Sequence, residues 1–117
     1  GMLIPCTLTS AFFKYEALLQ QGEAWGAYVF SDIAEKFGNM LFSGATAFYE
    51  TEDGASAFAN AGALCCGSAA YPAYFYMAYL CGIRAEEGVG FCLHEPLQGD
   101  VSEPHCRILT PKGELSV

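Results

Sequence analysis

The sequence predicts a single α+β domain that is helical over its first two thirds and ends in a β-hairpin. Apolar residues recur at helical spacing in several segments up to Gly82, whereas residues 89–94 and 106–109 form two short β-like runs. Glycine, proline and serine separate the segments, and no linker, internal repeat or low-complexity tract divides the chain. Because 117 residues is a common length for one domain, residues 1–117 are interpreted as a single folding unit.

Two amphipathic helices are expected in the first third. The first covers residues 11–21, or 10–22 with its cap and its terminal glycine, and the second covers residues 24–37 and ends at Gly38. Each helix carries one apolar stripe, as a helix packed on a core does. The stripes consist of Phe12, Tyr15 and Leu19 in the first helix, and of Trp25, Val29, Ile33 and Phe37 in the second.

The middle of the chain predicts one short strand and two more helices. Residues 45–50 alternate weakly and contain aromatic residues, which favours a strand, and a turn follows. A third helix is expected over residues 55–66, and Gly67-Ser68 form a sharp corner after it. The next helix begins near Pro72, which suits a first helical turn, and stops at Gly82.

The last third predicts one hairpin with a long loop. Residues 84–88 are interpreted as a polar connection, and residues 89–94 are expected to pair with residues 106–109. The intervening residues 95–105 contain two prolines and a glycine, which cannot continue either strand.

The composition excludes several classes of protein. Five Lys and Arg against thirteen Asp and Glu give a net charge of −8, which repels nucleic-acid phosphates unless cations cluster locally. The uncharged residues 54–83 are long enough to span a bilayer, but Gly62, Gly67 and Pro72 interrupt them, so a buried helix pair and no membrane contact are expected.

Cysteine usage favours a reducing compartment. Three of the six cysteines (Cys65, Cys66 and Cys81) lie in apolar segments, where a free thiol packs as a small hydrophobic group. The chain begins Gly1-Met2 without a basic segment typical of a signal peptide, so a cytoplasmic protein with reduced thiols is expected. The apolar share, 53%, is high for this length, so a homodimer is expected to bury the surplus.

The order of elements carries a resemblance to a known family. Residues 24–113 resemble the winged-helix (winged helix-turn-helix) family, with 10–22 as an extra N-terminal helix. YLCGI at residues 79–83 resembles the end of a recognition helix, and ILTPKG at residues 108–113 is similar to the exit of the wing. The resemblance implies a winged-helix-like helical bundle with a C-terminal β-hairpin wing.

The same resemblance implies a non-enzymatic protein that binds nucleic acid or regulates transcription. In that family the second helix of the pair lies in the major groove. Hydroxyl groups at the start of this helix and cations around the wing would then meet the nucleic acid. These residues are Ser68, Tyr71, Tyr74, Arg84, Arg107 and Lys112.

Two alternatives stay open. Residues 71–81 contain no Lys, Arg, Asn or Gln, so the same fold is also interpreted as an acidic module that has lost DNA binding and holds an unknown protein partner. The other alternative is a small metal or redox sensor, since cysteine and histidine are zinc ligands. Its ligands would be Cys92, His94, His105 and Cys106.

No cofactor and no catalytic residue is expected. The chain has no glycine-rich phosphate loop, no Gly-x-Ser-x-Gly motif and no His-Glu-x-x-His motif.

Overall fold

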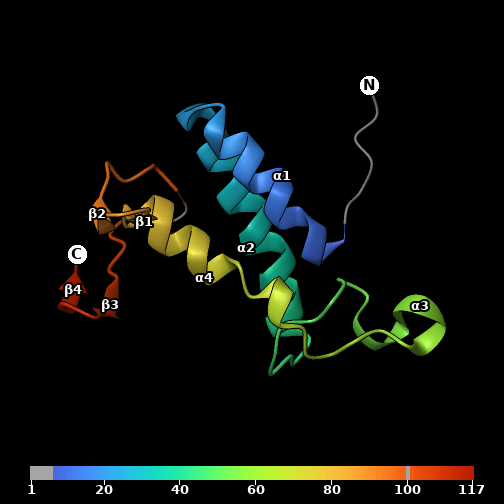
Figure 1. The fold of residues 1–117 in the computed structure, drawn as a ribbon. Helices are drawn as coiled ribbons and strands as arrows, with labels where there is room; N and C mark the ends of the chain where they lie inside the picture. The colour runs from blue at the N-terminus through green and yellow to red at the C-terminus, as the bar shows by residue number, and fades with distance from the viewer. Residues whose placement is uncertain (1–6, 100) are drawn as a thin grey trace.

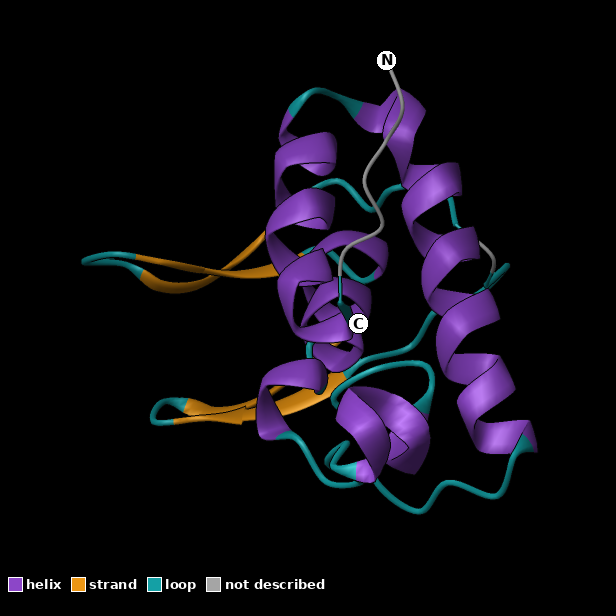
Figure 2. Ribbon diagram, turned by 90° about the vertical axis from the view of Figure 1, so that its right-hand side faces the viewer, coloured by secondary structure: helices purple, strands orange, loops and turns teal. Residues whose placement is uncertain are grey.

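The computed structural model describes residues 7–99 and 101–117, and it shows a layer of helices from which two β-hairpins project (Figures 1 and 2). The fold is therefore α+β, as predicted. The helical elements are α1 (Leu8–Gln20), η1 (Glu23–Trp25), α2 (Gly26–Phe42), η2 (Gly54–Ser56), α3 (Ala57–Asn60), η3 (Gly67–Ala69), α4 (Pro72–Phe75) and the π-helical η4 (Tyr76–Leu80). The strands are β1 (Ile83–Glu86), β2 (Gly90–Leu93), β3 (Arg107–Thr110) and β4 (Gly113–Ser116).

The two predicted N-terminal helices are present as α1 and α2. Gly22 turns the chain between them with a φ of 132°, a conformation that favours glycine. The expected stop at Gly38 is wrong, because α2 continues to Phe42. Met40 lies beyond Gly38 and is buried, so packing holds the helix together through the glycine. The helix ends at Phe42, and Gly44, whose φ is 87°, turns the chain two residues later.

The core lies between α1, α2 and the α4–η4 helix, and aromatic side chains dominate it. Tyr15, Phe30 and Phe75 are the largest fully buried side chains. The ring of Tyr71 packs edge-on against the rings of Phe37 and Phe75, with centroid distances of 5.6 and 5.8 Å. Offset and edge-to-face pairs at this spacing stabilise a core beyond the area they bury.

The strand expected over residues 45–50 is not present. The segment follows an irregular path and makes isolated backbone hydrogen bonds to the segment that follows α3. The N–H of Cys66 donates to the Phe48 carbonyl at 2.7 Å, and the N–H of Glu50 donates to the Ala63 carbonyl at 3.0 Å. These contacts are too sparse to form a ladder.

The helix expected over residues 55–66 is also wrong. α3 is a single turn in which Phe58 and Ala59 have left-handed backbone angles, and residues 61–66 are irregular. A Cβ atom at Gly62 would collide with the Gly54 carbonyl oxygen, so the chain folds back on itself there. Phe58, which the helix would have turned to the core, is exposed. The small side chains of this segment offer too little apolar surface to stabilise a helix by packing.

The corner at Gly67-Ser68 is present as η3, and the helix expected after Pro72 is present as α4 and η4. Because the segment before the corner is not helical, the predicted pair of helices is reduced to one. Figure 1 shows α3 at the end of the molecule away from the hairpins.

The predicted pairing of residues 89–94 with residues 106–109 is wrong. β1 pairs with β2, and β3 pairs with β4, so there are two hairpins with short turns. We call them hairpin 1 (β1–β2) and hairpin 2 (β3–β4). Of residues 84–88, expected to form a polar connection, the first three belong to β1, and Glu87 and Gly88 lie in the first turn, where Gly88 has a φ of 76°. In the second turn the Thr110 hydroxyl donates to the Gly113 carbonyl at 2.8 Å.

Both hairpins project to the same side of the helical layer, one above the other in Figure 2. Their projection makes the molecule larger than a compact domain. The radius of gyration is 15.5 Å, against about 13 Å for a compact domain of this length.

Candidate functional site

The structure separates the six residues expected at a nucleic-acid interface. Ser68 is exposed in η3, whereas the side chain of Tyr71 is buried in the aromatic core. Tyr74 is partly exposed on α4. The three cations lie on the hairpins: Arg84 on β1, Arg107 on β3, and Lys112 in the turn of hairpin 2. The burial of Tyr71 removes it from the surface, so the predicted set does not form one face.

Arg84 is held by contacts within the chain. Its Nε donates to the Ala78 carbonyl at 3.0 Å, and its guanidinium lies 4.4 Å from the centroid of the Tyr79 ring. A guanidinium over a ring face is attracted by the ring quadrupole. Arg107 approaches Glu114 at 3.9 Å on the surface, a weak pair in water.

Glu16, which the sequence did not single out, completes a polar cluster at the base of hairpin 1. The Tyr79 hydroxyl donates to Oε1 of Glu16 at 2.8 Å, whereas Oε2 is buried without a hydrogen-bond partner in the described part of the chain. Burial and the Glu16 carboxylate raise the pKa of Tyr79 far above its usual value. Burial and Glu16 also raise the pKa of Tyr74. The cluster joins α1 to η4 and so supports the hairpin.

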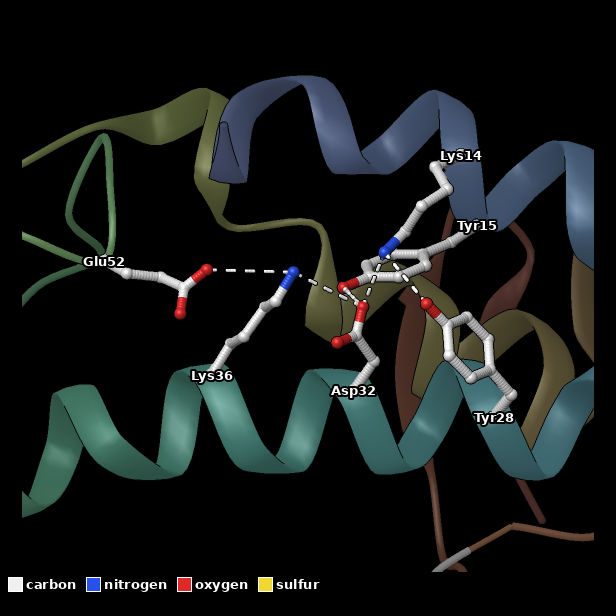
Figure 3. A network of polar contacts seen from close by, with 6 residues as sticks. All are labelled: Lys14, Tyr15, Tyr28, Asp32, Lys36 and Glu52. Carbon is white, nitrogen blue, oxygen red and sulfur yellow. Dashed lines mark hydrogen bonds and ion pairs between the residues drawn. The ribbon is translucent and has the colours of Figure 1, made fainter. Parts of the chain in front are cut away.

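The other two lysines belong to a network that joins α1 to α2 (Figure 3). Oδ2 of Asp32 accepts from Lys14 at 2.6 Å and from the Tyr15 hydroxyl at 2.7 Å, and it lies 3.4 Å from Lys36. Lys36 also reaches Glu52 at 3.7 Å. Burial opposes the charge of Asp32, but the hydrogen bonds from Lys14 and Tyr15 outweigh it, so the pKa of Asp32 lies below its usual value.

The four residues considered as metal ligands do not converge. Cys92 and His94 both face Glu86, and Nε2 of His94 lies 2.6 Å from Oε1 of Glu86. His105 and Cys106 lie at the start of hairpin 2. Within residues 7–99 and 101–117, no three His, Cys, Asp or Glu side chains are placed to hold a metal ion. The predicted alternative zinc site is therefore not formed.

A cleft of about 470 Å³ lies between the hairpins, and sequence reasoning missed it. It is lined from one side by hairpin 1 and from the other by hairpin 2. Its lining residues are Val89, Gly90, Phe91, Thr110, Pro111, Lys112, Gly113, Glu114 and Leu115.

The walls of the cleft are mainly apolar. In hairpin 1, Phe91 lies opposite Ala85, and in hairpin 2, Leu115 lies opposite Ile108. Side chains of directly opposed residues share a face, so each hairpin presents an apolar face that reaches the cleft. Phe91 and Val89 remain 41% and 60% exposed, which leaves apolar surface uncovered in this structure.

The strands around the cleft have unpaired edges. Each sheet has two strands, so every strand has one neighbour in the described sheets. β2 and β4 both contribute residues to the cleft. An unpaired edge presents backbone N–H and carbonyl groups that an added strand can bond.

Comparison of the chain with protein-family models, with curated proteins and with solved structures found no match. Among the described residues, every helix is too short or too polar to cross a bilayer.

Proposed function

We propose that this chain is a protein-interaction module that holds an extended segment of a partner protein in the cleft between hairpins 1 and 2. The observation that carries the proposal is the cleft itself, an apolar space of about 470 Å³ between two strand pairs with unpaired edges. An extended segment would add backbone hydrogen bonds at a strand edge and place alternate side chains against the apolar faces.

Charge defines the chemistry of the segment. The chain carries a net charge of −8. Glu114 and Lys112 line the cleft with opposite charges, and Glu87 adds a negative charge in the adjoining turn of hairpin 1. A second copy of the chain would bring the same negative charge, whereas a segment with lysine or arginine between apolar residues would be attracted. We therefore assign the cleft to an extended segment in which apolar and basic residues alternate.

The winged-helix comparison and nucleic-acid binding stay predictions, and the placement of the cations favours the protein partner over them. Non-specific affinity for a duplex arises from phosphate contacts, about six to ten of them in a strong binder. Lys14 and Lys36 face Asp32, and Arg84 faces Tyr79 and the Ala78 carbonyl. Lys112 and Arg107 are the cations that remain exposed on hairpin 2.

The proposal is tested with a fluorescein-labelled peptide of about eight residues, alternating Val and Lys, a length that matches a short strand. Fluorescence anisotropy measures its dissociation constant for the full chain, beside a Val–Glu peptide and a mixed-sequence DNA duplex at about 50 mM salt. The Val–Lys peptide is expected to bind, and the other two probes are expected to bind more weakly by at least about tenfold.

Three variants locate the binding. Phe91→Ala and Val89→Ser remove apolar side chains from the cleft, and Val89 lies in a turn, where it does not disturb strand pairing. Phe91→Ala is expected to weaken binding about tenfold or more, because an apolar side chain of this size contributes about 1.5–3 kcal/mol when buried. The control is Leu109→Ala, on hairpin 2 but outside the cleft and 84% exposed.

Several results would refute the proposal. These are the absence of Val–Lys binding at about 1 mM peptide, equal binding by all three variants, or tighter binding of the duplex. Sedimentation equilibrium tests the expected homodimer: a dimer that Phe91→Ala dissociates would assign the cleft to a second copy instead.

A further inference from the structure

Two thiols meet where hairpin 2 leaves the helical layer. Cys81 is buried directly after η4, and Cys106 is half-buried directly before β3. The two side chains interact, because the neighbouring Cys106 contributes to raising the pKa of the Cys81 thiol. They are separated by hairpin 1 and its following loop in the sequence, so the fold brings them together.

The backbone places Cys106 beside Cys81 independently of the thiols. Cys106 and Val117 exchange two backbone hydrogen bonds, with N–O distances of 3.1 and 2.9 Å. Val117 in turn lines, with Leu80 and Cys81, a cleft of about 370 Å³ under the loop that follows hairpin 1. The base of hairpin 2 therefore lies against the end of η4.

Hairpin 2 has few other attachments. β3 and β4 pack extensively only against each other among the described elements, whereas β1 also packs on η4. Hairpin 1 is fixed further by the His94 N–H, which donates to the Gly82 carbonyl at 2.7 Å. A covalent link at the base of hairpin 2 would therefore constrain it more than any contact now present.

We propose that Cys81 and Cys106 are a redox-active pair that a low-molecular-weight disulfide oxidises to an intrachain disulfide. The link would fasten hairpin 2 to η4 and thereby set the distance between the two walls of the cleft. Disulfide formation does not depend on the proposed protein binding, so the two ideas are tested separately.

The chemistry is thiol–disulfide exchange in two steps. The thiolate of Cys106, the more exposed of the two, attacks one sulfur of the small disulfide and releases one small thiolate, leaving a mixed disulfide. The Cys81 thiolate then attacks the Cys106 sulfur and releases the second small thiolate. Two protein thiols lose two protons and two electrons, and one small disulfide becomes two thiols.

The order of attack follows from burial. Burial raises the pKa of the Cys81 thiol, and the neighbouring Cys106 raises it further, so Cys81 is a poor first nucleophile in solution. Once Cys106 carries the mixed disulfide, Cys81 needs only to reach its immediate neighbour.

The test oxidises the reduced full chain with oxidised glutathione, alkylates the remaining thiols under unfolding conditions and maps the tryptic peptides by mass spectrometry. Cleavage after Lys36, Arg84 and Arg107 puts Cys106 in one peptide with Cys92, and Cys81 in one peptide with Cys65 and Cys66. The matched controls are therefore Cys92→Ser and the double variant Cys65→Ser/Cys66→Ser. The cross-link between the peptide that holds Cys81 and the peptide that holds Cys106 is expected in the wild type and in both control variants. It is expected to be lost in Cys81→Ser and in Cys106→Ser.

A second measurement excludes a simple folding defect. The melting temperature of reduced Cys106→Ser is expected to match that of the reduced wild type. Oxidation is expected to raise the Tm of the wild type by about 10 °C and to leave that of Cys106→Ser unchanged.

Three results would overturn the inference: mixed glutathione disulfides without a cross-link, a cross-link through Cys92 or Cys65 in place of Cys81–Cys106, or a link between two chains on a non-reducing gel. None of these results depends on whether the Val–Lys peptide binds.

Discussion

Replacing Ala59 by glycine tests the left-handed turn in α3, where the structure departs most from the sequence-based prediction. Phe58, Ala59 and Asn60 have φ values of 51°, 56° and 71°. The left-handed region crowds the Cβ atom of an L-residue against the following carbonyl oxygen. Ala59 is exposed, so Ala59→Gly removes the crowded atom without opening a cavity.

The expected change in the free energy of unfolding caused by Ala59→Gly is the difference between two effects. A left-handed conformation costs an L-residue about 1–2 kcal/mol, and glycine loses roughly 0.5–1 kcal/mol more backbone entropy than alanine on folding. Ala59→Gly is therefore expected to stabilise the fold by about 0.5–1 kcal/mol. For a chain of 117 residues this raises the Tm by about 2–4 °C.

If residues 55–66 formed a helix, Ala59→Gly would instead destabilise the fold, because glycine in a helix interior is about 1 kcal/mol less favourable than alanine. Thermal unfolding by circular dichroism and urea unfolding measure the difference in free energy of unfolding. The matched control is Ala17→Gly at an exposed position inside α1, which is expected to destabilise by about 1 kcal/mol. If Ala59→Gly lowers the Tm as Ala17→Gly does, the left-handed turn is refuted.

Three other substitutions test the contacts that hold the helices and hairpin 1. Asp32→Asn is expected to destabilise by about 2 kcal/mol at pH 7, since it weakens charge-assisted hydrogen bonds. Because the pKa of Asp32 is lowered in the fold, urea unfolding should show the deficit above pH 3.8 and its loss as the pH falls further. Gly82 has a φ of 73°, and a Cβ atom added there would clash with the His94 carbonyl. Gly82→Ala is therefore expected to lower the free energy of unfolding by about 2 kcal/mol or more in thermal unfolding. Gly22→Ala is the control and is expected to lower it less, because nothing lies near its Cβ position. Tyr79→Phe is expected to destabilise by about 1–2 kcal/mol in urea unfolding, because it removes the hydrogen bond to Glu16. Ultraviolet titration should show that it removes a tyrosine whose pKa lies well above the usual value.

The sequence predicted the parts of the fold in which large apolar side chains recur at helical spacing. α1 and α2 carry such stripes, and Tyr15, Val29 and Ile33 are buried where the pattern placed them. The end of α2 was misplaced at Gly38, because a glycine is a helix stop only when the chain beyond it has nothing to bury. Met40 does have a place in the core.

Residues 55–66 show the converse case. Their spacing is compatible with a helix, but most of the side chains are small, and a helix forms mainly when packing stabilises its apolar face. Instead, the backbone of Gly62 lies against the Gly54 carbonyl, a contact that is possible only because Gly62 has no side chain. Periodicity alone carries no information about such backbone contacts.

The strand pairing was predicted wrongly because each β-run pairs with its neighbour in the sequence through a short turn. The prediction had paired the two β-like runs, residues 89–94 and 106–109, across a long loop. Residues 84–88 contain charges that suggested a connection, but charged side chains suit a two-stranded ribbon with an exposed face. Gly88 and Gly113 supply the positive φ values of the two turns. A hairpin closed by a short turn also avoids the entropy of closing a long loop.

The candidate site was even less predictable than the fold. Tyr71 was assigned to a surface because it begins a tyrosine-rich helix, yet that helix lies against α1 and α2, which turns Tyr71 into the core. Phe91 and Leu115 gave no separate signal, since each is an ordinary apolar residue in a short strand. Their significance arises from the side-by-side projection of the two hairpins, which is a tertiary feature.

The two hairpins and the charge balance together favour a partner that is neither a duplex nor a second copy. The apolar faces of the two hairpins lie near each other but leave apolar surface exposed to water. Covering that surface would stabilise the protein by roughly 25 cal/mol for each Å² buried. The bonds at Thr110 and Val117 lie within hairpin 2 and at its base, so hairpin 2 is a ribbon of its own and a cleft remains between it and hairpin 1. A bound segment fills the space without distorting either ribbon. Because the whole chain carries eight more carboxylates than Lys and Arg side chains, the segment that gains most is basic as well as apolar.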